Sequence, residues 1–252
     1  MPKATAPNGY ILYQGPSNID GKPIVVIATG FANKSSNGKT GDMIQTWIIR
    51  EDIAPNEAIK SGEDESICGQ CIHRPARKAE IEATGVKHIR CYVKVWQAPL
   101  VVWKAYKRGL YPVASYDDIA KLCAERMVRF GSYGDPYAAP MALWEAMASK
   151  ALGWTGYTHQ WRTAGAGWSR LVMASADSMA DSREAWLRGY RTFRVGAVPM
   201  MGREVNCPAS KEAGERTQCI SCKLCMGSTS KAPVSIQIAP HGAGARHYKE
   251  AA

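Results

Sequence analysis

Continuous apolar runs, separated by polar loops and helix-type segments, mark the first half of the chain. Residues 24–30 form a run of Ile, Val and Ala that ends in glycine, which predicts a buried strand. Residues 43–50 predict a second strand, because Ile, Thr and Trp favour extended backbone. A helix is predicted at 99–109, with a proline near its start and a glycine as its C-cap. Ser115 predicts the N-cap of a further helix.

From residue 127 onward, strand-like and helix-like segments alternate. The predicted strands are at 127–130, 153–161, 170–175, 191–195 and 204–207, and the predicted helices are at 140–152 and 181–189. This alternation predicts an α/β fold, a full or partial (β/α) barrel of mostly parallel strands. We expect a single domain made of an irregular arm (1–23), a barrel-like core (24–206) and a cysteine-rich, metal-binding segment (207–252).

The net charge, the apolar runs and the N-terminal residues indicate which partners and which cellular compartment to expect. Its 252 residues carry a formal net charge of +10, which favours a polyanionic partner, nucleic acid first. The sequence holds no apolar run of 18 residues, so no membrane span is predicted. The N-terminus has no apolar signal region, so the sequence predicts a cytoplasmic protein whose cysteines stay reduced.

Four of the eight cysteines fall within 19 residues, at Cys207, Cys219, Cys222 and Cys225. The spacing C-x2-C-x2-C lets one loop turn several sulfurs onto a single point, where thiolates bind zinc or the iron of a [4Fe-4S] cluster. The structural alternatives are disulfides or free buried cysteines. Four thiolates would fill a closed, structural site.

A second group of cysteines lies earlier in the chain. Cys68 and Cys71 form a C-x-x-C turn, and Cys91 opens a predicted strand at 90–95. Three thiolates leave room for a fourth ligand, either His73 or an external molecule, as a reactive site requires. The alternative is a redox-inert C-x-x-C turn, with Cys91 packed in its strand.

Polar residues stand at the ends of several predicted strands, where ligands bind in β/α folds. Among them, Asp135, His159 and Asp177 are the candidate catalytic residues. Each also has a structural alternative: Asp135 as the cap of a turn, His159 as a hydrogen-bonded core residue, and Asp177 as the cap of the following helix.

Gly38-Lys39-Thr40 follows the first predicted strand, as a phosphate-binding loop would. Asn33 stands where such a loop needs its first glycine, and no good helix follows. A polar loop or hairpin is therefore the better interpretation.

The order of these motifs resembles a group of uncharacterised bacteriophage proteins that are similar in architecture to radical-SAM enzymes. The motifs are Cys68-x2-Cys71, Arg90-Cys91-Tyr92, Gly131-Ser-Tyr-Gly-Asp-Pro, Thr155-Gly-Tyr-Thr-His-Gln-Trp and the segment 207–225. The resemblance implies a partial β/α barrel with iron–sulfur clusters, in the cytoplasm of a bacterial host. In radical-SAM enzymes, three cysteines hold a cluster whose open iron binds S-adenosylmethionine, and Cys68, Cys71 and Cys91 stand at the matching place. Their gaps are two and 19 residues, whereas the usual pattern is C-x3-C-x2-C.

A second family also fits: tRNA-guanine transglycosylases and their DNA-acting relatives are similar β/α barrels with a zinc site of three cysteines and a histidine, although their glycine-rich recognition motifs are missing from this sequence. Cys219, Cys222 and Cys225, with His241 or His247, would supply that site. The resemblance implies that Asp135 or Asp177 attacks the anomeric carbon or activates the nucleophile, with the base held out of the stack. A third interpretation is a non-enzymatic, metal-stapled nucleic-acid-binding protein.

Overall fold

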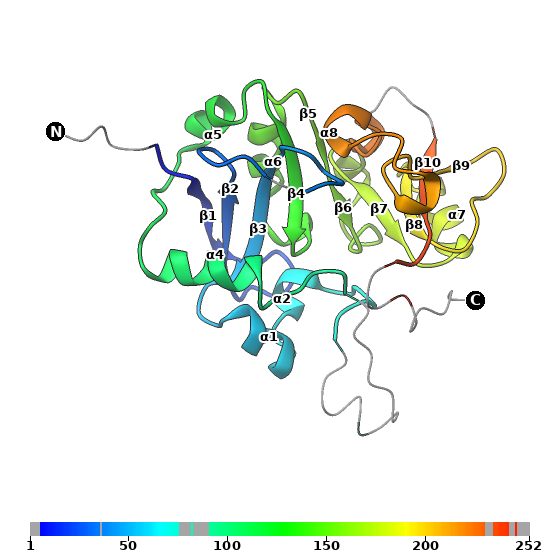
Figure 1. The fold of residues 1–252 in the computed structure, drawn as a ribbon. Coiled ribbons are helices and arrows are strands. Elements are labelled where there is room, and N and C mark those ends of the chain that lie inside the picture. Colours follow the sequence, from blue (N-terminus) through cyan, green and yellow to red (C-terminus); the bar gives the residue numbers. More distant parts are fainter. Residues whose placement is uncertain are drawn as a thin grey trace.

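A computed structural model of the chain describes residues 6–35, 37–75, 82, 91–229, 234–241 and 245. Its strands form two five-stranded sheets with helices packed around them (Figure 1). The first sheet uses strands from the N-terminal part of the chain and the second uses strands from the C-terminal part, so the two sheets follow each other in sequence.

The first sheet has the strand order β1-β2-β3-β4-β5. Its strands are β1 (Gly9–Pro16), β2 (Pro23–Thr29), β3 (Ile44–Arg50), β4 (Met127–Tyr133) and β5 (Gly153–Thr155). The pairings β1–β2 and β2–β3 are antiparallel, and the other two are parallel. The strands predicted at 24–30 and 43–50 are confirmed.

The prediction of an irregular arm at 1–23 is wrong for residues 9–16, which form strand β1. This strand pairs with β2 along its length and buries Ile11 and Leu12 against the core. A tight turn from Ser17 to Lys22 joins the two strands, with the Gly21 N–H donating to the Ser17 carbonyl. The apolar residues of β1 are stabilised by pairing with β2, the strand directly after the turn. Many polar and turn-forming residues surround them in the sequence, so the strand pattern was not recognised there.

The second sheet has the order β6-β7-β8-β10-β9, and all its pairings are parallel. Its strands are β6 (Tyr157–Thr158), β7 (Met173–Ala176), β8 (Thr192–Val195), β9 (Glu204–Asn206) and β10 (Ser235–Ile238). The last strand in the sequence, β10, therefore lies between β8 and β9. Because the strands are parallel, their C-terminal ends meet at one edge.

The structure shows a mixed α/β fold with two mostly parallel sheets, which confirms the α/β part of the predicted fold class. The strands that it describes do not close into one ring. The helices are α1 (Pro55–Ser61), α2 (Glu65–Cys68), α4 (Ala98–Lys107), α5 (Tyr116–Leu122), α6 (Met141–Ala148), α7 (Met179–Leu187) and α8 (Cys219–Cys222). Short 3-10 helices are η1 (Pro136–Ala138), η2 (Ala166–Arg170), η3 (Lys211–Ala213) and η4 (Gly227–Thr229). Across the described ranges, no helix is long and apolar enough to cross a membrane.

The strand predicted at 153–161 is divided into β5 and β6, which belong to different sheets. Gly156 lies between them, and a Cβ atom there would come within 3.0 Å of the Val172 side chain. Its N–H donates to the carbonyl of Cys225 at 3.3 Å. The break therefore gives the C-terminal segment a backbone contact at the junction of the two sheets.

The prediction of a strand at 90–95 is wrong for residues 91–95, which the structure describes. Residues 91–94 have no regular secondary structure, and a turn at 95–97 leads into α4. Arg90 lies outside the described residues. The β-favouring residues of this segment pack against the core through Val95 instead of pairing with a strand. Cys91 is thus carried by an irregular connection.

Candidate metal and ligand site

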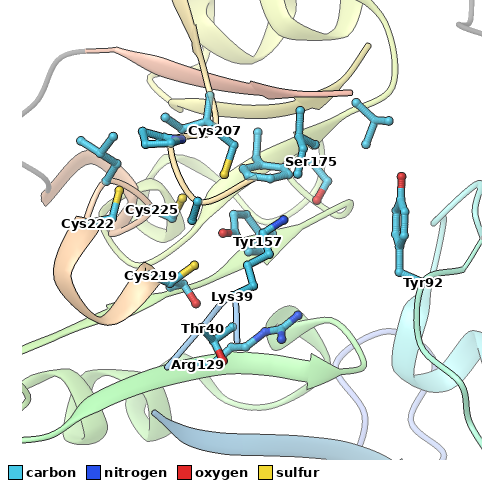
Figure 2. Close-up of a pocket in the computed structure, with 18 of the residues that line it drawn as sticks. Lys39, Thr40, Tyr92, Arg129, Tyr157, Ser175, Cys207, Cys219, Cys222 and Cys225 are labelled. Atoms are coloured by element: carbon cyan, nitrogen blue, oxygen red, sulfur yellow. The ribbon is translucent and has the colours of Figure 1, made fainter. Parts of the chain in front are cut away.

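A cavity of about 300 Å³ lies at the C-terminal edge of the second sheet. Three strands each deliver a lining residue just after they end: His159 after β6, Asp177 after β7 and Cys207 after β9. In open α/β sheets, this edge is where ligands bind. Figure 2 shows part of the lining, including residues from the loop before β3, from β4 and from the region of α8.

Four cysteine side chains line one side of this cavity, and all four are free thiols: Cys207, Cys219, Cys222 and Cys225. In Figure 2 they surround one region of the pocket, with Cys207 coming from the end of β9 and the others from α8 and the turn after it. Lys223 has a φ of 57°, a left-handed conformation that turns the chain between the last two cysteines. The fold therefore brings all four predicted ligands to a common cavity.

The four sulfurs are not as close together as the ligands of a single zinc ion. With Zn–S bonds of about 2.3 Å, the sulfurs of a tetrahedral site lie about 3.8 Å apart. No three of these cysteines form a group whose Sγ atoms all lie within 4.8 Å of one another, in the part of the chain that the structure describes. The four thiols line one cavity, but their sulfur atoms are not gathered around a single ion-sized position.

Burial raises the pKa of three of these thiols. The pKa of Cys225 rises to about 12, through burial and the charges of the neighbouring cysteines. Burial also raises the pKa of Cys207 and Cys219, while the nearby Lys39 opposes the rise in both. These thiols are neutral at pH 7 in the absence of a metal, and a bound metal would displace their protons.

Two sets of hydrogen bonds hold the cysteine-bearing segment. The loop before β3 accepts from the N–H groups of Cys219 and Ile220, at its Lys39 and Thr40 carbonyls, with distances of 3.0 and 3.1 Å. On the other side, the Arg191 guanidinium donates to the carbonyls of Leu224 and Gly227, which flank Cys225. The segment 218–227 is thereby fixed to both sheets.

His73, His159 and Asp177 form a compact group at another part of the cavity. The Asp177 carboxylate lies between the two imidazoles: Oδ1 is 2.9 Å from His73 Nε2, and Oδ2 is 3.4 Å from His159 Nε2. One ligand atom from each residue lies within 4.8 Å of the other two. Asp177 is not the helix cap, since Ser178 accepts the N–H of Asp181 at the start of α7.

Several buried polar atoms of this group have no hydrogen-bond partner: His73 Nδ1, His159 Nε2 and Asp177 Oδ1. His73 Nε2 is near Asp177 Oδ1, but the pair does not have the geometry of a hydrogen bond. Burial alone would lower the pKa of His159, yet Cys71 and the Asp177 carboxylate raise it well above its usual value. Burial would raise the pKa of Asp177, but the rings of His159 and His73 hold it well below its usual range.

Cys68, Cys71 and Cys91 do not line the cavity, although Cys71 interacts with His159. Burial raises the pKa of Cys68 well above its usual value, and the charges of Cys71, Asp64 and Cys91 add to the effect. Burial likewise raises the pKa of Cys91 to about 11. The three thiols influence one another electrostatically, but in the described residues they do not form a compact ligand group.

Asp135 lies outside the cavity and has a supporting position. One carboxylate oxygen accepts the Tyr137 N–H at the start of η1, at 3.0 Å, and the other accepts the His159 N–H at 2.8 Å. Burial raises its pKa, and these hydrogen bonds oppose the rise. Of the three predicted catalytic residues, the structure brings His159 and Asp177 together at the cavity and uses Asp135 to fix the backbone of His159.

The sequence analysis missed several residues that line the cavity: Lys39, Thr40, Tyr92, Arg129, Tyr157 and Lys223. Tyr92 stacks on His241, with ring centroids 4.7 Å apart and an interplanar angle of 26°. His241 also lines the cavity but belongs to no compact ligand group of the described residues, and His247 lies outside them. The Gly38-Lys39-Thr40 sequence was the one available signal for the basic side of the cavity.

The chain matches no family model, and neither a curated protein nor a solved structure is significantly similar to it.

Proposed function

We propose that the chain is an iron–sulfur enzyme that acts on a nucleotide or on a nucleic-acid base. The observation that carries this proposal is the cavity itself: four free cysteines line it, and an imidazole–carboxylate group and basic side chains face the same space. Cys207, Cys219, Cys222 and Cys225 would hold the cluster. A cluster held by four thiolates would supply electron-transfer chemistry next to a bound substrate.

The spacing of the thiols favours a cluster over zinc. A cluster is wider than a single ion and therefore holds its thiolates further apart. The four cysteines share the cavity without any three of them lying within 4.8 Å of one another, among the described residues. Two basic side chains, Lys39 and Arg129, face the same thiols and offset the negative charge of a thiolate-bound cluster.

The rest of the lining suits an anionic ligand that contains a flat ring. Tyr157 and Phe193 pack together with ring centroids 4.7 Å apart, and Tyr92 provides a further aromatic surface. Aromatic rings bind bases by stacking, and lysine and arginine bind phosphates. The net charge of +10 agrees with a polyanionic partner.

The proposal does not extend to S-adenosylmethionine. That chemistry needs a cluster with an open iron that faces the substrate. Cys68, Cys71 and Cys91 do not line the cavity, so the structure offers no support for placing such an iron there.

Metal analysis of the anaerobically purified chain tests the proposal. We expect visible absorption together with roughly four iron and four sulfide ions per chain, the content of one [4Fe-4S] cluster. Zinc without acid-labile sulfide would contradict the cluster. That result would leave the four cysteines as a zinc site.

Binding of a labelled single-stranded oligonucleotide, followed by fluorescence anisotropy, tests the class of ligand. We expect an affinity that falls steeply with salt, and Lys39→Ala should reduce the slope of log K against log[salt] by about 0.7 for each lost phosphate contact. Lys34→Ala is the matched control, because Lys34 is an exposed residue of the same loop that does not line the cavity. Equal slopes for the two variants would exclude a phosphate contact at Lys39.

Asp177 favours a second candidate, a base glycosylase or transglycosylase. Its carboxylate lines the cavity and its lowered pKa keeps it ionised, as a nucleophile at an anomeric carbon requires. Incubation with DNA and RNA should then produce abasic sites that disappear with Asp177→Asn. Iron and acid-labile sulfide without abasic sites would favour the iron–sulfur proposal.

A further inference from the structure

We propose that His73, His159 and Asp177 bind one divalent transition-metal ion, at a site separate from the four cysteines. Two imidazoles and one carboxylate suit Zn(II), Fe(II) or Mn(II). The inference rests on the geometry of these three residues and holds whether the cysteines bind a cluster, zinc or nothing.

The three residues are close enough together to bind one ion, since a ligand atom of each lies within 4.8 Å of the other two. When nitrogen and oxygen ligands lie about 2.0–2.1 Å from a tetrahedral metal, they are about 3.4 Å from one another. Asp177 Oδ2 is 3.4 Å from His159 Nε2, and Oδ1 is 2.9 Å from His73 Nε2. No other His, Cys, Asp or Glu group of the described residues meets the same 4.8 Å limit.

The hydrogen bonding points to a missing partner. His159 Nε2 and Asp177 Oδ1 are buried, and their contacts within the group are ion pairs that lack the geometry of a hydrogen bond. A buried polar atom without a well-formed hydrogen bond is costly, and more so when the group is charged. The residues His73 and Asp177 are only 7% and 8% exposed, so bulk water does little to relieve this cost. A cation between the three side chains would satisfy these atoms together.

Hydrogen bonds to carboxylates fix the backbone of two of the three proposed ligands. The N–H of His159 donates to Asp135 Oδ2 at 2.8 Å, and the N–H of Asp177 donates to Asp181 Oδ2 at 3.0 Å.

The turn that carries His73 is anchored by its neighbour. The Arg74 guanidinium donates to both carboxylate oxygens of Asp64, at 3.0 and 2.9 Å, and to the carbonyls of Gly62 and Gly69. Asp64 is buried, so this bidentate pair fixes the turn.

Three protein ligands leave at least one coordination position free, which is the arrangement of a catalytic site. All three residues line the cavity, so the free position faces the space in which we place the substrate. Water or a substrate oxygen would occupy it. The site is thus suited to Lewis-acid activation of a bound oxygen.

Equilibrium dialysis against Zn(II), after treatment with a chelator, tests the site. The wild-type chain should bind one more zinc ion than either His159→Ala or Asp177→Asn. Acid-labile sulfide should be the same in all three proteins, which separates this result from the fate of the four cysteines. Ser175→Ala is the control, since it changes the same cavity wall without removing a metal ligand.

A second measurement uses the wild-type chain alone, in case the variants fold poorly. Zinc should shift the imidazole NMR signals of two of the five histidines. Equal zinc binding by the wild-type chain and folded variants would overturn the proposal. Histidine signals that zinc leaves unchanged would overturn it as well.

Discussion

Replacing Cys222 by serine is expected to lower the affinity for the proposed cluster by at least about tenfold, the loss that follows removal of even a supporting residue of a metal ligand, so the purified chain should carry less iron and acid-labile sulfide. Cys222 lines the cavity and is only partly buried, so the substitution removes a thiolate while disturbing little packing. Because the binding energy of a structural metal becomes folding energy, the melting temperature should fall with the metal content. Metal analysis and thermal unfolding of the same samples would show both effects.

Cys123→Ser is the matched control for this experiment. Cys123 is buried in the core at the end of α5 and does not line the cavity. Its replacement buries a hydroxyl and should cost about 1–3 kcal/mol of stability, but leave iron and sulfide unchanged. If Cys222→Ser kept its iron and sulfide, Cys222 would not be a ligand of the proposed cluster.

Arg194→Met is expected to destabilise the chain by about 3–5 kcal/mol, because it leaves the carboxylate of Glu204 buried without its cation. Both side chains are fully buried, and the guanidinium donates to the two carboxylate oxygens at 3.0 and 2.7 Å. Glu204 also accepts the N–H of Met200 at 2.9 Å. A shift of the Glu204 carboxylate after removal of the guanidinium would therefore also weaken the loop before β9. Urea unfolding measures the change in free energy.

The double variant Arg194→Met with Glu204→Leu should recover most of the lost stability, since replacing a whole buried ion pair by apolar residues is often neutral. Arg203→Met is the control: this arginine is exposed and contacts the ring of Trp186 at 5.5 Å, so its loss should cost less than about 1 kcal/mol. A single variant as stable as the wild-type chain would show that the pair contributes nothing.

The elements that could be predicted from the sequence are those with a strong local pattern. The run at 24–30 is apolar at its first five positions and becomes most of β2, which is almost completely buried. Ser115 was predicted as an N-cap and accepts the Asp118 N–H. The strand β1 was missed, because its pattern is short and its stability depends on pairing with β2.

The residue types of the candidate site could be predicted from the sequence, but the residues from distant segments that contact them could not. Local spacing identified Cys219, Cys222 and Cys225, and strand ends identified His159 and Asp177. The role of Asp135 as a support for His159 depends on a contact across 24 residues, which spacing does not reveal. The contribution of Lys39 likewise depends on the loop before β3 meeting a segment about 180 residues later in the sequence.

Because β10 lies between β8 and β9, the second sheet can be completed only after the C-terminal strand has been synthesised. Strand β9, which places Cys207, pairs with β10 and is not a neighbour of β8. During synthesis, all eight cysteines leave the ribosome before residues 235–238 do. A nascent chain that ends before residue 235 therefore carries every thiol but lacks the strand that seats Cys207. The proposed cluster would therefore assemble only after the C-terminal strand has been synthesised, and premature termination there would yield a chain that carries the four thiols without the strand beside Cys207.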